Sequence, residues 1–138
     1  MSLPPYNRDA ELAVLGCILS AGSYSPKAGR RILERVQAVG LTASVFWFPS
    51  NAALFAILER RAGEALALDA VSIAAEIEDE AYRKLGPLAE LALTEAVNVE
   101  ILRAKLEMLA ASVTAFGNVE AHARIVVARA KQREEAAA

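Results

Sequence analysis

The stretch that decides the fold runs from Ala10 to Leu19 and reads AELAVLGCIL. Asn7 or Asp9 can cap a helix at its start, because a short polar side chain accepts a hydrogen bond from a free backbone N–H. Gly22 marks the expected end of this helix. Apolar residues occupy almost every side of it, which is the pattern of a helix buried all round. We therefore expect it to form the centre of an all-α bundle.

The rest of the first two thirds of the chain also reads as helices, because residues that favour helix, such as alanine, leucine and glutamate, are abundant. Pro26 opens a second helix, since proline is well accepted at the first helical position. Ser50 or Asn51 is expected to cap a third helix, and Asp69 a fourth. Together these helices form a predicted helical bundle head over residues 1–96.

The last third carries a narrow apolar seam, whose residues are spaced four or three apart as at the a and d positions of a coiled coil. The seam residues are Leu102, Leu106, Leu109, Val113 and Phe116, followed after a Gly-Asn break by Val119, Ala123, Val126 and Ala130. Two seamed helices joined by a very short turn predict an antiparallel helical hairpin. This hairpin spans residues 97–135 within the same structural domain, and 136–138 form a tail or the start of a linker.

Other apolar residues of the predicted hairpin lie off the seam. They are Ile101, Met108, Ile125 and Val127. Because apolar surface left in water favours association, we expect these four side chains to face a second chain. The sequence therefore predicts a self-association interface on the outer side of the hairpin.

The amino-acid composition limits the classes of protein to which the chain can belong. The chain has 138 residues, the size of one domain, and a net charge of −2, which gives no overall field to attract nucleic acid. Contact with DNA through this chain is therefore expected to be weak or absent. A single cysteine cannot form an internal disulfide, and no apolar run approaches the roughly 20 residues that span a bilayer. We expect a cytoplasmic localisation without membrane contact.

The sequence offers no catalytic, cofactor-binding or metal site. It has no glycine-rich loop followed by Lys and Ser or Thr, the pattern of a nucleotide phosphate cradle. The lone His122 fits a half-buried residue beside the seam better than a metal ligand, and Cys17 fits a core residue better than a nucleophile. An acidic cluster at 76–80 is interpreted as a solvated helix end. A basic set is interpreted as a solvated face rather than a nucleic-acid site: Lys27, Arg30, Arg31 and Arg35.

Several segments resemble the N-terminal domain of DnaB-type bacterial replicative DNA helicases, a family with phage and plasmid relatives. Residues 4–16, PPYNRDAELAVLG, are similar to the family's opening of two prolines, a short capping residue, an Ala-Glu pair and Val-Leu-Gly. Phe48-Pro49, followed by Leu54-Phe55, resembles the family's aromatic entry into its third helix.

Two later segments continue the resemblance. Residues 69–73, DAVSI, are similar to the family's Asp-x-Val-Thr-Leu helix start, and residues 118–126 with Arg133 are similar to the final helix of the domain. The matches fall in the family's order across nearly the whole chain.

The resemblance implies a non-catalytic collar domain of a replicative helicase. Six such domains pair into dimers and form a hexamer as a trimer of dimers, which docks primase and, as a second candidate partner, a helicase loader. ATP and magnesium would belong to a motor domain that this chain lacks, so no cofactor is expected here. Two other classes remain open: a free-standing helical dimerising adaptor or regulator, and a nucleic-acid-binding helical bundle.

Overall fold

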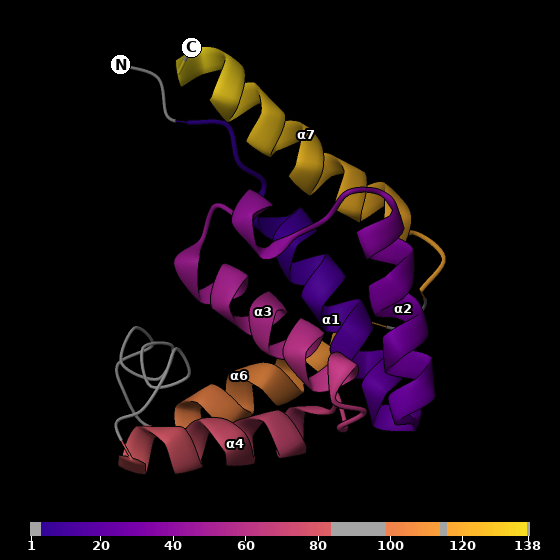
Figure 1. The fold of residues 1–138 in the computed structure, drawn as a ribbon, viewed down its shortest axis with the longest axis vertical. Coiled ribbons are helices and arrows are strands. Elements are labelled where there is room, and N and C mark those ends of the chain that lie inside the picture. The colour runs from indigo at the N-terminus through magenta and orange to yellow at the C-terminus, as the bar shows by residue number, and fades with distance from the viewer. Residues whose placement is uncertain (1–3, 84–98, 114–115, 138) are drawn as a thin grey trace.

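The computed structural model describes residues 4–83, 99–113 and 116–137, and every regular element in these ranges is a helix (Figure 1). The elements are α1 (Arg8–Tyr24), α2 (Pro26–Ala38), the 3-10 helix η1 (Ala43–Val45), α3 (Pro49–Gly63), α4 (Ala70–Arg83), α6 (Val99–Ala111) and α7 (Val119–Ala137). The predicted all-α class is confirmed.

Helix α1 is the centre of the bundle, as its composition predicts. Asn7 caps it by accepting a hydrogen bond from the Ala10 N–H at 2.9 Å. Helices α2, α3, α6 and α7 all pack against α1 (Figure 1), and every residue of α1 from Val14 to Gly22 is buried. Leu15 and Ile18 are completely buried in the resulting core.

Two further helix starts also form as expected. Ser25 caps α2 by accepting the Ala28 N–H at 3.0 Å. Asp69 caps α4 by accepting hydrogen bonds from the Ser72 N–H and hydroxyl at 3.1 and 2.7 Å. Burial opposes ionisation of Asp69, but the hydrogen bonds from Ser72 and from its own backbone N–H, together with the charge of Arg61, outweigh it, so the pKa of this carboxyl lies below its ordinary value.

The start of α3 differs from the expectation. The capping position is Phe48, which has no side-chain cap, so the predicted caps at Ser50 and Asn51 are wrong. The carboxylate of Glu11, on α1, takes over this role and accepts hydrogen bonds from the Trp47 N–H at 2.7 Å and the Phe48 N–H at 3.4 Å. A negative charge is favourable at a helix N-terminus, and Glu11 is only 1% exposed.

The predicted antiparallel hairpin over 97–135 is wrong. Helix α6 packs against α1 and α4, whereas α7 packs against α1, α2 and η1. Figure 1 shows α6 beside α4 at the foot of the bundle and α7 across its top. The physical reason is that α1 is apolar on every side, so it offers each seam more apolar surface than the other seam does.

The seam residues nevertheless mark the buried faces of these two helices. Leu106, Val119, Ala123, Val126 and Ala130 are buried, and Leu109, Val113 and Phe116 are half-buried against the same core. Ile125 and Val127 are half-buried and also pack against this core, and their place at an interface with a second chain stays a prediction. Met108 is 72% exposed, as expected. The side chains of Ile101 and Leu102 lie outside the described residues.

Two glycines allow helices to approach α1 closely. A Cβ added at Gly16 would lie 2.8 Å from the carbonyl oxygen of Leu109 on α6. A Cβ added at Gly22 would lie 2.6 Å from the carbonyl oxygen of Leu68, just before α4. Both distances are shorter than real Cβ contacts, and backbone atoms cannot move aside cheaply. The close approach of α6 to α1 therefore requires glycine at position 16, and the close approach of the segment before α4 requires glycine at position 22.

Leu15→Ala should lower the free energy of unfolding by about 2–5 kcal/mol, because it removes a fully buried side chain from the central helix. Urea denaturation followed by circular dichroism measures the loss. The control is Met108→Ala at an exposed position, which should change stability by less than about 0.5 kcal/mol. Equal effects of the two substitutions would contradict the central place of α1.

Gly22→Ala should destabilise the fold by about 1–3 kcal/mol, because the added methyl group meets the Leu68 backbone. Gly63→Ala is the matched control, since a Cβ there meets no atom within 4 Å. That control should leave stability unchanged or raise it by up to about 1 kcal/mol, the helix preference of alanine over glycine. Thermal unfolding of both variants separates the effect of the steric clash from the effect of the helix preference of alanine.

Glu11→Ala should cost at least about 2 kcal/mol, because it leaves the Trp47 N–H and the Asn51 amide without their acceptor. Glu11→Gln keeps the size and one acceptor oxygen, so it should cost less. Equilibrium unfolding gives both values. A Glu11→Ala variant as stable as the parent chain would show that this carboxylate does not hold α3.

Candidate functional site

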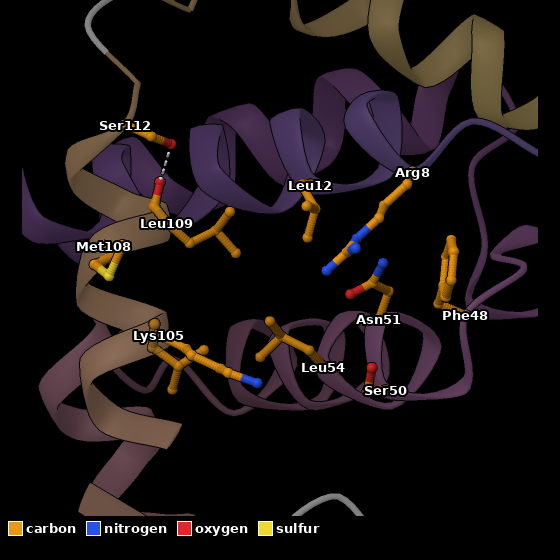
Figure 2. A pocket seen from close by; sticks show the side chains of 11 residues that line it. Arg8, Leu12, Phe48, Ser50, Asn51, Leu54, Lys105, Met108, Leu109 and Ser112 are labelled. Atoms are coloured by element: carbon orange, nitrogen blue, oxygen red, sulfur yellow. Dashed lines mark hydrogen bonds between the residues drawn. The ribbon is translucent and has the colours of Figure 1, made fainter. Parts of the chain in front are cut away.

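A groove of about 450 Å³ lies between α1, α3 and α6 (Figure 2). Its lining residues are Arg8, Leu12, Phe48, Ser50, Asn51, Leu54, Lys105, Leu106, Met108, Leu109 and Ser112. Sequence reasoning had named Leu106, Met108 and Leu109 among them, but had assigned them to a hairpin. It did not connect them with the residues of α1 and α3 that complete the groove.

Helical spacing explains why these side chains converge. On α1, Arg8 and Leu12 are four residues apart and so lie on one face. On α6, residues 105, 108 and 109 form one stripe by the same periodicity, and Ser112 follows directly after the end of the helix. Leu54 on α3 and Leu106 on α6 are buried in the floor, while Met108 stands exposed at the rim. The floor is therefore apolar, and its walls are three packed helices.

Among the described residues that line the groove, the charged ones are Arg8 and Lys105. The guanidinium of Arg8 lies 5.9 Å from the centre of the Phe48 ring, within the range of a cation–π contact. In Figure 2 the guanidinium of Arg8 and the amino group of Lys105 point into the groove from α1 and α6. The nearby carboxylate of Glu11 is turned inward and accepts a hydrogen bond from the Asn51 amide at 3.0 Å.

An aromatic corner closes the end of the groove at Phe48. The Tyr6 ring stacks on Trp47 with centroids 6.0 Å apart and meets Phe48 edge-on at 5.3 Å. Arg133, on α7, lies 5.3 Å from the centre of the Trp47 ring. It also donates hydrogen bonds to the carbonyl oxygens of Pro5 at 2.7 Å and Val45 at 2.8 Å. Arg133 thus ties both ends of the chain to η1.

The isolated histidine and cysteine are not assembled into a reactive site. Cys17 is buried in the core, and burial raises the pKa of its thiol despite the opposing effect of Arg35. His122 is half-buried, and within the described part of the chain its Nδ1 has no hydrogen-bond partner. In the same described ranges, no group of three His, Cys, Asp or Glu residues could hold a metal ion.

The acidic cluster proves to be partly structural. Glu76 pairs with Arg60 and with the buried Arg61, whose Nη1 lies 2.8 Å from the carboxylate, and so joins α3 to α4. Glu78 lies 3.7 Å from Arg103 and joins α4 to α6. The interpretation of 76–80 as a solvated helix end is therefore wrong for Glu76, whereas Glu78, whose side chain is 40% exposed, still fits it. The side chain of Glu80 lies outside the described residues.

The basic set on α2 is divided between two roles. Arg35 forms an ion pair with Glu120 and donates to the Phe116 carbonyl oxygen at 3.4 Å, so it ties α2 to α7. Lys27 and Arg31 are exposed on the solvent side of α2, as a solvated face requires. None of the helices in the described ranges is long and apolar enough to cross a membrane.

Comparisons with known proteins agree with this architecture. The family described as "DnaB-like helicase N terminal domain" matches residues 3–128. The chain is similar to a solved structure, the N-terminal domain of DnaB helicase from Mycobacterium tuberculosis, with a TM-score of 0.71 and 22% identity. That similarity covers 95% of this chain and 75% of the other, and shows a shared fold. No curated protein matches the chain. Because the family match spans most of its length, the chain belongs to the DnaB-like helicase N-terminal domain family, the non-catalytic domain of these helicases.

Proposed function

We propose that this chain is the collar domain of a DnaB-type replicative helicase, which associates with copies of itself and docks primase or a helicase loader during DNA replication. The observation that carries the proposal is the family match over residues 3–128. The same match favours a helicase domain over a free-standing adaptor. ATP and magnesium would act in the motor domain of the helicase, and replication of DNA would place the protein in the cytoplasm.

The groove between α1, α3 and α6 supports the docking part of this proposal. It is concave and apolar, it carries an exposed methionine at its rim, and methionine adapts well to partner surfaces. Ile125 and Val127 are half-buried against their own core, so they offer a second chain less apolar surface than Met108 does. Four residues are predicted to face a second chain. Among those whose side chains the structure describes, Met108 is the one that is strongly exposed.

Met108→Glu should weaken binding of the primase encoded in the same genome by about tenfold, or about 1.4 kcal/mol, because a charge would enter a desolvated contact. Val71→Glu is the matched control, since Val71 is 56% exposed on α4 and does not line the groove. Calorimetric titration measures both affinities, and circular dichroism checks that both variants stay helical.

Sedimentation of the unmodified chain tests the self-association part separately. Its mass should rise with concentration toward a dimer or a larger assembly. A chain that stays monomeric at the highest concentration and binds neither primase nor loader would overturn the collar proposal.

A further inference from the structure

The end of α7 contacts the bundle mainly through one side chain. The buried face of this helix includes Val126 and Ala130, and Arg133 is the next position on that face, three residues later. Among residues 131–137, Arg133 is half-buried and the others are exposed. The apolar stripe of α7 is therefore continued at its end by a guanidinium group.

Arg133 joins the end of α7 to two segments that are distant in the sequence. Its guanidinium donates hydrogen bonds to the carbonyl oxygens of Pro5 at 2.7 Å and Val45 at 2.8 Å. Figure 1 shows the N-terminal segment running beside the end of α7. Hydrogen bonds from a charged donor are stronger than those between neutral groups, so these contacts hold the three segments together.

The charges in the last turn of α7 oppose its helical structure. Glu134 and Glu135 stand in this turn, where the free carbonyl groups of the helix concentrate partial negative charge. Carboxylates are unfavourable at that end, and exposed helix ends open at a low cost in free energy. The closed position of the end of α7 therefore depends on Arg133.

The N-terminal segment depends on the same junction. Tyr6 stacks on Trp47 with ring centroids 6.0 Å apart, and Arg133 lies 5.3 Å from the centre of the same Trp47 ring. The indole is thus shared between the N-terminal segment and α7. Loss of Arg133 removes the bond to Pro5 and a neighbour of Trp47 at once, so both segments should loosen together.

We propose that residues 131–137 form a latch, which closes on the N-terminal segment through Arg133, so that the end of α7 and residues 4–7 are fixed or released together. A partner that binds one of these segments would change the mobility of the other, because coupling between two sites is reciprocal. The latch is a conformational device of the domain itself. It does not depend on the docking role proposed above.

Hydrogen exchange of the complete chain, followed by mass spectrometry, tests the α7 side of the latch. Arg133→Ala should speed exchange in residues 131–137 about tenfold, because it removes two hydrogen bonds from a charged donor. Exchange in Val14–Gly22, the buried part of α1, should stay slow and show that the variant is folded. Lys131→Ala is the matched control, since it removes an exposed cation from the same helix end and should change neither segment.

A fluorophore on Pro4→Cys tests the N-terminal side, because Pro4 is exposed and the natural Cys17 is buried. Arg133→Ala should lower the anisotropy of this fluorophore, whereas Lys131→Ala should leave it unchanged.

Removal of residues 1–5 tests whether the two sides are coupled. It takes away the Pro5 carbonyl and should speed exchange in residues 131–137 about fivefold, the effect of one hydrogen bond. In the Arg133→Ala background the same removal should change this exchange by less than about twofold, because the link is already broken.

Unchanged exchange in residues 131–137 after Arg133→Ala, or an equal change after Lys131→Ala, would overturn the inference. Faster exchange there with unchanged anisotropy at position 4 would also overturn it, because the two segments would then move independently. The same holds if removal of residues 1–5 acts equally in both backgrounds. Loss of protection in Val14–Gly22 after Arg133→Ala would make Arg133 a support of the whole fold and would exclude a latch.

Discussion

Burial of α1 between Val14 and Gly22 is the constraint on which the other helices depend. A helix with apolar residues on every side leaves water only when neighbours surround it, and burial of each large apolar side chain stabilises the fold by about 1.5–3 kcal/mol. Helices α2, α3, α6 and α7 supply those neighbours. The glycines at 16 and 22 set how closely α6 and the chain before α4 approach. The arrangement of the bundle therefore follows from the need to cover one helix.

The same constraint explains what the sequence could and could not predict. Local signals were sufficient for the caps at Asn7 and Asp69 and for the buried faces of α6 and α7, because each depends on residues within a few positions. The predicted pairing of α6 with α7 is wrong, because an apolar seam such as the one through Leu106 and Leu109 indicates that a helix face is buried but does not identify the element that covers it. The choice of α1 as partner depends on the relative apolar surface of three helices, which no single segment reveals.

Hydrogen bonds between segments far apart in the chain could not be predicted from the sequence, for a related reason. In the sequence, Glu11 is a polar residue within an apolar helix. The Trp47 N–H, which donates a hydrogen bond to its carboxylate, lies 36 residues later in the chain. Arg133 bonds to Pro5 across 128 residues. In both cases the side chain satisfies backbone groups that have no local partner, so its role appears only once the helices are in place. The groove itself has the same origin, since Arg8, Asn51 and Lys105 come from three helices.

Core packing and the groove between α1, α3 and α6 are therefore coupled in this domain. Helix α6 meets α1 closely at Gly16, and its stripe from Lys105 to Leu109 lines the groove between α1, α3 and α6, while Glu107 borders a second hollow that Asp69 also lines. Glu11 holds the start of α3, which carries the opposite wall. A partner that docks in this groove, as proposed above, would contact side chains whose backbones are fixed by the core. Preformed surfaces bind at a lower cost in conformational entropy than surfaces that must first order.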